Sequence, residues 1–188
     1  EAVTGCPWQR ARPPTAADGE RCERNREDVY QRVVDEVDPD VVFLSDGGGE
    51  WASEAPTNVD PLVESASRDL RSLLGEDRTV VMIEVMPSPV DGMDPLDCMS
   101  DAIIIEECRF VTSDELHWRE DVFRDLADDN DRAFTVDLDR LVCPHAPICD
   151  PLLDGRAVFW NAYHITAAHS AAVGPALGEV LEDAVLLP

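Results

Sequence analysis

The sequence predicts an α/β fold in which a parallel sheet carries helices on both faces. Amphipathic helical patterns alternate with strand patterns along the chain, which favours parallel strands. The strand patterns are short, uninterrupted apolar runs such as Val41–Leu44, typical of strands covered on both sides. The 188 residues, 44% of them hydrophobic, suit one compact core. We therefore expect a single domain over residues 1–188.

The first half of the chain contains two predicted helices and the first predicted strand. Apolar residues at helical spacing predict a helix over residues 24–38. The apolar run 41–44 predicts a strand, which the serine and glycines at 45–49 end. Asp60 followed by Pro61 is typical of a helix start and predicts a helix over residues 60–75.

Two more strands and two more helices are predicted in the second half. Thr79–Val85 and Ala133–Val136 are the second and third strands. Thr112 and Glu115 have the spacing of a capping box, so a helix is expected to begin there. The closing helix is expected from Thr166.

Ligands of open parallel sheets bind beyond the carboxyl ends of the strands. The loops at 45–51, 86–108 and 137–164 follow the predicted strands, so we expect them to converge on that edge. A binding or catalytic site is therefore sought in these loops.

The charge of the chain is strongly acidic. Forty Asp and Glu residues stand against 15 arginines and no lysine, which gives a formal net charge of -25. Such a surface repels phosphate backbones and anionic membranes, so nucleic acid is not an expected partner. No apolar stretch reaches the length of about 18 to 20 residues that a transmembrane helix needs.

Six cysteines form three couples that are close in sequence. Six cysteines allow 15 connectivities, but pairing neighbours closes three short loops without long-range strain. We therefore expect the disulfides Cys6–Cys22, Cys98–Cys108 and Cys143–Cys149, and with them an oxidising compartment outside the cytosol. The alternative is six buried free thiols in a cytosolic enzyme.

Histidines are the first candidates for a catalytic base, because only their unperturbed pKa lies near neutrality. His117 and His169 fall in predicted helices, which favours surface or packing roles. His145 lies between Cys143 and Cys149, where zinc is conceivable, but no fourth ligand is evident and oxidised cysteines cannot ligate.

His164 differs from the other histidines. It stands where an irregular segment meets the last predicted helix, three residues after the polar Asn161. We expect no metal at this site. An acidic run at 128–131 could suggest a calcium site, but it lacks the glycine and the spaced glutamate of an EF-hand loop.

Several segments along the chain carry a resemblance to a known family. In chain order they are Gly5–Trp8, Cys22–Arg26, Asp38–Leu44, Cys143–Pro144, Ile148–Cys149, Asp154–Arg156 and His164–Thr166. On these residues the chain resembles the SGNH-hydrolase-like domain of acyltransferase-3 membrane proteins, with the three cysteine couples in matching places. The resemblance covers nearly the whole chain.

The resemblance implies a fold, a location and a reaction. The fold is a three-layer, flavodoxin-like α/β/α sandwich, and the location is extracytoplasmic, tethered to the plasma membrane. The implied reaction is serine-based acyl transfer from an acylated donor to a glycan acceptor at the cell surface, without a cofactor. The implied partner is the membrane acyltransferase domain of the same polypeptide.

Two departures from the family pattern concern the catalytic residues. The family's terminal block reads Asp-x-x-His; His164 matches the histidine, the general base, but Asn161 stands at the aspartate that orients it. The family's Gly-Asp-Ser nucleophile motif is absent. Because Gly5–Pro7 matches a region just after the family's second strand, we expect the first strands and the nucleophilic serine to lie upstream of Glu1.

Other residues could complete or replace this site. Ser45 is an alternative nucleophile at a strand end. Gly47, Gly48, Gly49 and Trp51 are expected to form a pocket wall with oxyanion donors. Asp150 or Asp154 could compensate for the missing carboxylate. The alternative function is a catalytically inactive domain that binds glycan or scaffolds a membrane acyltransferase.

Overall fold

The computed structural model describes residues 6–10, 19–45, 60–113 and 117–183. The chain forms two compact units. The first comprises residues 1–84 and 118–136, and the second comprises residues 85–117 and 137–188. Within the described ranges, no helix combines the length and the apolar composition needed to cross a bilayer.

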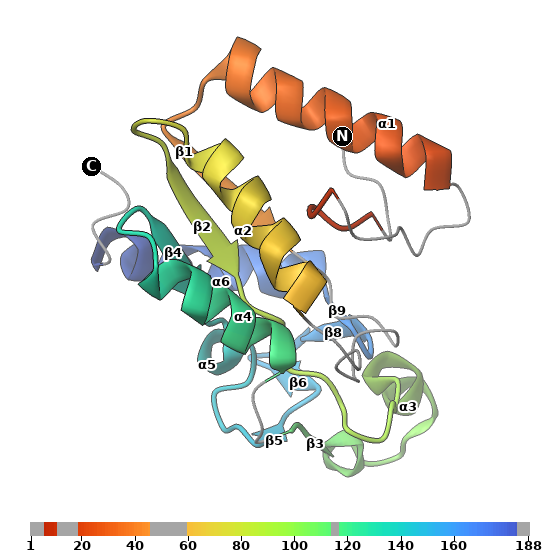
Figure 1. The fold of residues 1–188 in the computed structure, drawn as a ribbon. Helices are drawn as coiled ribbons and strands as arrows, with labels where there is room; N and C mark the ends of the chain where they lie inside the picture. Colours follow the sequence, from red (N-terminus) through yellow and green to blue (C-terminus); the bar gives the residue numbers. More distant parts are fainter. Residues whose placement is uncertain (1–5, 11–18, 46–59, 114–116, 184–188) are drawn as a thin grey trace. The chain divides into compact units, whose positions relative to one another are not determined.

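The first unit is built on a parallel sheet of three strands in the order β1-β2-β4 (Figure 1). Its strands and helices are α1 Gly19–Gln31, the π-helix Arg32–Val37, β1 Val41–Ser45, α2 Asp60–Leu74, β2 Thr79–Ile83, α4 Trp118–Asp128 and β4 Ala133–Val136. The parallel pairing confirms the predicted α/β fold. In the central strand Val80, Val81 and Met82 are all fully buried, as expected for a strand covered on both faces.

Helix α2 buries most of the apolar stripe that its sequence predicts. On α2 the residues Ala66, Leu70 and Leu73 are almost completely buried. They join one core cluster with residues of the sheet and of α4, among them Met82 and Phe123. The predicted start at Asp60-Pro61 is therefore the observed start of α2.

The first predicted helix begins earlier than expected and changes geometry before it ends. It starts at Gly19, and its last turns form the π-helix that ends at Val37. Asp38 then takes a left-handed conformation with φ 44. The buried Arg78 stabilises this exit, since its guanidinium donates to the Pro39 carbonyl at 2.9 Å and to Asp38 Oδ1 at 2.7 Å.

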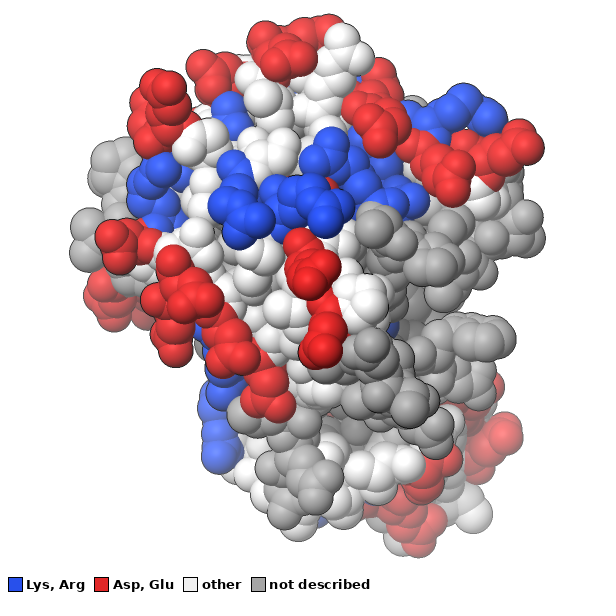
Figure 2. Space-filling model, viewed as in Figure 1, with Lys and Arg blue, Asp and Glu red and all other residues white. Residues whose placement is uncertain are grey.

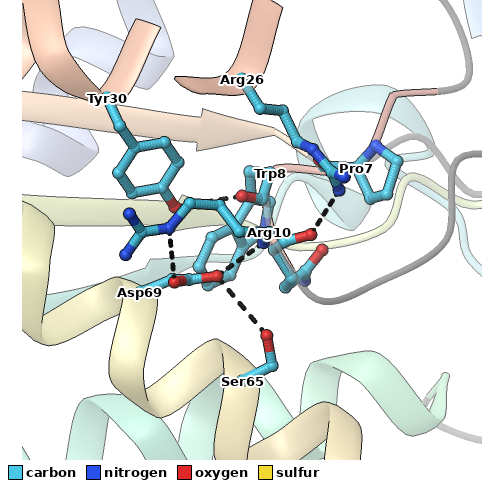
Figure 3. Close-up of polar contacts among 8 residues, drawn as sticks. Pro7, Trp8, Arg10, Arg26, Tyr30, Ser65 and Asp69 are labelled. Atoms are coloured by element: carbon cyan, nitrogen blue, oxygen red, sulfur yellow. Dashed lines mark hydrogen bonds and ion pairs between the residues drawn. The ribbon is translucent and has the colours of Figure 1, made fainter. Parts of the chain in front are cut away.

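A buried carboxylate anchors the segment around Arg10 to α2 (Figure 3). Asp69 Oδ2 accepts from the Arg10 backbone N–H at 2.6 Å, and Oδ1 accepts from Arg10 Nε at 2.9 Å. The Arg10 guanidinium also lies 4.5 Å from the centre of the Tyr30 ring, and Tyr30 Oη donates to the Trp8 carbonyl at 3.0 Å. Burial raises the pKa of Tyr30, which keeps the hydroxyl a donor.

All three predicted disulfides are present. They join Cys6 to Cys22, Cys98 to Cys108 and Cys143 to Cys149, with Cα–Cα distances of 5.5, 5.8 and 5.1 Å. The alternative of free thiols is wrong, because no cysteine is left unpaired. In the chain-entropy account each short loop contributes about 2 to 3 kcal/mol.

The second unit consists of short elements. They are α3 Pro95–Asp101, the 3₁₀ helix Ile105–Cys108, β3 Phe110–Val111, α5 Asp139–Val142, β5 Ile148–Cys149, β6 Leu152–Leu153, β7 Arg156–Ala157, β8 Phe159–Asn161, β9 His164–Ile165 and α6 Ala167–Asp183. Its core cluster includes Phe110, Val142, both cysteines of the last disulfide, Val158 and Phe159. Figure 1 shows the paired strands β8 and β9 side by side.

Two predictions in this part of the chain are wrong. Residues 86–108 contain the helix α3, whose N-cap Asp94 accepts from the N–H groups of Leu96 and Asp97. Thr112 does not cap a helix. It forms a β-bridge with Pro89, and its N–H donates to the Pro147 carbonyl at 2.8 Å, so α4 begins only at Trp118.

The closing helix α6 begins at Ala167 and continues through Pro175 to Asp183. Thr166 caps it, since its Oγ1 accepts from the His169 N–H at 3.1 Å. Its most buried residues are His169 and Leu181, whereas Val180 is 40% exposed. His169 therefore has the packing role that was expected of it.

Candidate functional site

The candidate base His164 lies on a short antiparallel hairpin at the entrance to α6. Strand β8 pairs with β9 so that Asn161 stands opposite His164 and Phe159 stands opposite Ile165. Two residues, Ala162 and Tyr163, make the turn between them. The hairpin therefore brings together the two residues that the sequence analysis paired as base and orienter.

Strand β8 of the hairpin is anchored in the core of the second unit. Val158 and Phe159 are almost fully buried, and the Phe159 ring meets the Phe110 ring edge-on with centroids 5.1 Å apart. The disulfide between Cys143 and Cys149 belongs to the same core cluster. The last cysteine loop thus supports the strand that carries Asn161.

Thr166 fixes the other strand of the hairpin. Its N–H donates to the Val158 carbonyl at 2.8 Å, and its Oγ1 donates to the Ala157 carbonyl at 2.6 Å. The same oxygen accepts from the His169 N–H, which starts α6. His164 is two residues from this junction, so its backbone is held by the strand pairing on one side and by Thr166 on the other.

The Asn161 side chain determines which nitrogen of His164 carries the proton. Asn161 Oδ1 lies 2.9 Å from His164 Nδ1 and also 2.9 Å from the Tyr163 backbone nitrogen. A backbone N–H can only donate, so the atom that faces it must be the amide oxygen rather than the amide nitrogen. The same oxygen then accepts from Nδ1–H, which leaves the lone pair on Nε2.

This arrangement can accept a proton. His164 is exposed, and the fixed tautomer leaves Nε2 as its basic nitrogen. The Tyr163 N–H was not singled out in the sequence, because a backbone donor has no residue signature. A rotated Asn161 amide would present its NH₂ group to the imidazole and select the wrong tautomer. The hydrogen bond from the Tyr163 N–H to Asn161 Oδ1 prevents this rotation.

The other predicted site residues are not brought to the hairpin by any described contact. Ser45 is the exposed last residue of β1 and belongs to the first unit. Gly47, Gly48, Gly49 and Trp51 lie outside the described residues. Their expected part in a pocket wall or in oxyanion binding stays a prediction.

The two carboxylates considered as substitutes for an aspartate at 161 have other partners. Asp150 Oδ1 accepts from Arg109 Nε at 2.6 Å, and Asp150 Oδ2 lies 3.3 Å from His145 Nδ1. The hydrogen bond from Arg109 lowers the pKa of Asp150. Asp154 is 85% exposed and pairs with Arg156 at 3.1 Å. Neither carboxylate has a described contact with His164.

The metal alternatives have little support in the structure. The disulfide uses both sulfurs of Cys143 and Cys149, so they cannot act as thiolate ligands beside His145. The three aspartates of the acidic run at 128–131 are exposed. Over the described ranges, no three His, Cys, Asp or Glu side chains are grouped as a metal ion requires.

A shallow depression elsewhere in the second unit was not predicted. It has a volume of about 490 Å³ and is lined by Ile103–Glu106, Arg109 and Asp150–Leu152. Ile103 is 98% exposed, and the disulfide between Cys98 and Cys108 closes the loop that carries it. The sequence signal was the unbroken isoleucine triplet at 103–105.

The charges of the two units differ. Twelve of the fifteen arginines fall in the first unit, whereas the second unit has fifteen acidic residues and three arginines. On the face shown in Figure 2, arginines gather in one band and acidic side chains surround them. The hairpin with His164 thus belongs to the more uniformly acidic unit.

The chain is similar to a known protein family and to a solved structure. Residues 2–179 match the family described as the SGNH domain fused to AT3 domains. A solved structure, the periplasmic domain of a lipopolysaccharide acetyltransferase from Salmonella ser. Paratyphi A, is similar with a TM-score of 0.59 and 14% sequence identity. The match covers 86% of this chain and 62% of that chain, and at this identity it shows the fold alone. No curated protein sequence matches the chain significantly.

Proposed function

Because the chain belongs to the family of SGNH domains that are fused to AT3 domains, we propose that it transfers acyl groups to cell-surface glycans by serine-based catalysis. His164 is the general base, and Asn161 positions its imidazole. The observation that carries this proposal is the 2.9 Å contact of Asn161 Oδ1 with His164 Nδ1. The Tyr163 N–H on the same oxygen leaves Nε2 as the proton acceptor.

The reaction proceeds in two steps. In the first, Nε2 of His164 takes the hydroxyl proton of a serine, whose oxygen attacks the carbonyl carbon of the acylated donor. The donor's leaving group departs with that proton, and an acyl-serine remains. In the second, Nε2 takes the proton of a glycan hydroxyl, whose oxygen attacks the acyl-serine; the serine leaves and recovers the proton.

The nucleophile is proposed to lie outside these 188 residues. No Gly-Asp-Ser occurs in the sequence, and Ser45 precedes the glycines rather than following them. Glycines 47–49 and Trp51 remain our candidates for the oxyanion donors and the pocket wall. No cofactor is needed, because each step balances with the serine, the imidazole and the two substrates.

The proposed location is extracytoplasmic. Three disulfides favour an oxidising compartment, and the similar solved structure is a periplasmic domain. The proposed partner is the AT3 membrane domain of the same polypeptide, which would tether this domain to the membrane. The proposed substrates are an acylated donor and a glycan acceptor.

The test is glycan acylation by the full-length protein with the acyl donor supplied. His164→Ala should abolish acylation, because no other described group can take the proton at this position. The matched control is His145→Ala, since the His145 side chain is 72% exposed in the same unit and pairs with Asp150 rather than with the hairpin. Acylation that survives in His164→Ala would show that the assignment of the base is wrong.

A second candidate function is favoured by Asn161 itself. A neutral amide holds the imidazole but carries no charge to stabilise the imidazolium that forms during proton transfer. The domain could therefore be catalytically inactive and bind glycan or scaffold the membrane domain. Covalent labelling with a serine-directed fluorophosphonate separates the two functions, because an inactive domain gives no specific adduct.

A further inference from the structure

We propose that Trp160 is the platform on which the acceptor sugar stacks, and that the acceptor is an uncharged glycan. This inference rests on the proposed function, since it names the substrate class of the same site. It starts from the geometry of the hairpin that carries Asn161 and His164.

Trp160 is the extra residue of the hairpin. Phe159 pairs with Ile165 and Asn161 pairs with His164, so one strand has a residue between its two pairs and the other strand has none. Such a bulge breaks the strict alternation of side chains and re-aims the extra residue, and bulges are over-represented next to active sites. The bulge here directly precedes the residue that holds the candidate base.

The Trp160 side chain is exposed although its neighbours are buried. It is 64% exposed, while Val158, Phe159 and Ala162 are at most 6% exposed. The buried neighbours fix the backbone on both sides of it. An exposed indole gains the free energy of burial only when a ligand covers it. Tryptophan is accordingly enriched among the residues that contribute most to binding.

The chemistry of an indole matches one face of a sugar ring. A pyranose has C–H groups on its faces and hydroxyls around its rim, so its face can lie on a flat aromatic ring while the rim stays hydrogen-bonded. Tryptophan supplies a large, rigid contact area at a low cost in side-chain entropy. Trp160 directly precedes Asn161 in the sequence, and the Asn161 side-chain oxygen contacts His164 Nδ1. A sugar stacked on Trp160 would therefore be bound on the strand that positions the candidate base.

The charge of the unit favours a neutral sugar. Fifteen acidic residues against three arginines repel uronic acids and phosphate-bearing sugars. Arg109 is engaged with Asp150, and Arg156 lies near Asp154 at 3.1 Å. A neutral pyranose meets no such repulsion.

The test measures acceptor binding, so that it does not depend on turnover. The full-length protein with His164→Ala is titrated calorimetrically with a neutral oligosaccharide of the acceptor glycan. The measurement is repeated with Trp160→Ala, with Trp160→Phe and with the control Ile103→Ala, whose side chain is 98% exposed in the same unit. A uronate-containing oligosaccharide is titrated in parallel at low and at high salt.

We expect Trp160→Ala to weaken binding of the neutral oligosaccharide about tenfold, and Trp160→Phe to weaken it much less, because Phe retains an aromatic face. The uronate-containing sugar should bind more weakly at low salt and recover at high salt. Unchanged affinity in Trp160→Ala, or an equal loss in Ile103→Ala, overturns the platform. Tighter binding of the uronate at low salt overturns the neutral acceptor. Loss of acylation in His164→Ala is unaffected by these results and tests the proposed function separately.

Discussion

Replacing Asn161 by aspartate should increase the rate of acyl transfer. The Asn161 oxygen already accepts from His164 Nδ1 and from the Tyr163 N–H, both at 2.9 Å. A carboxylate accepts both hydrogen bonds in the same geometry, so the orientation of the imidazole is kept. What Asn161→Asp adds is a negative charge beside the imidazolium that forms in the transition state.

The size of this effect follows from the exposure of the site. Two unit charges about 4 Å apart attract by about 1 kcal/mol in water and about 4 kcal/mol at an effective dielectric constant of about 20. His164 is exposed, so the lower value applies. About 1 kcal/mol corresponds to an increase in kcat of about fivefold. This is far below the factor of about 10⁴ lost in serine proteases with the reverse change, where the amide also selects the wrong tautomer.

The assay is the initial rate of glycan acylation by the full-length protein at saturating donor. Asn161→Asp should be faster than the natural protein, and Asn161→Ala should be slower, because it removes the acceptor for both N–H groups. Thermal unfolding of each variant controls for folding. A folded Asn161→Asp protein that is no faster would refute the role of Asn161. An increase near 10⁴ would instead show that the natural protein holds the wrong tautomer.

Two further predictions concern stability. Asp69→Ala should lower the free energy of unfolding, measured in urea, by about 2 to 3 kcal/mol, because it removes both hydrogen bonds to Arg10 and leaves that charge half-buried. A loss below about 0.5 kcal/mol, the scale of a neutral surface substitution, would show that the anchor contributes little. Burial, followed by the charge of Arg156, lowers the pKa of His169. Stability should therefore be complete above the unfolded pKa of about 6.5 and fall as the pH decreases below it, since the unfolded state then binds the proton first. His169→Phe should remove this dependence, whereas His145→Ala should keep it, and equal pH profiles for His169→Phe and the natural protein would contradict the reasoning.

The parallel sheet was predictable because its signals are local. Thr79–Val85 predicts β2, whose residues Val80, Val81 and Met82 are fully buried, as a strand covered on both faces requires. For Val41–Leu44 the strand is correct but the two-sided burial is wrong, since only Leu44 is buried and Phe43 is 46% exposed. The start of α2 was also predictable from Asp60-Pro61. The same Asp-Pro signal is present at Asp94-Pro95, where α3 begins, but a helix of seven residues is too short to give a periodic apolar pattern.

The error at Thr112 arose because this residue has a non-local partner. Thr112 has a capping-box neighbour in sequence, but its N–H and its Oγ1 both donate to the carbonyl of Pro147, 35 residues away. In the candidate site, too, some features are predictable from the local sequence and others are not. His164 and Asn161 follow from the terminal motif, whereas the tautomer depends on the backbone N–H of Tyr163, and the prominence of Trp160 depends on a bulge. Neither feature is encoded by residue type alone.

The most direct test of the central claim is covalent labelling of the full-length protein with a serine-directed fluorophosphonate. If His164 activates a serine, the natural protein is labelled on one serine, and His164→Ala removes the label while His145→Ala keeps it. Absence of a specific adduct in the folded natural protein, or an adduct that persists unchanged in His164→Ala, would contradict the account and favour an inactive domain that binds glycan.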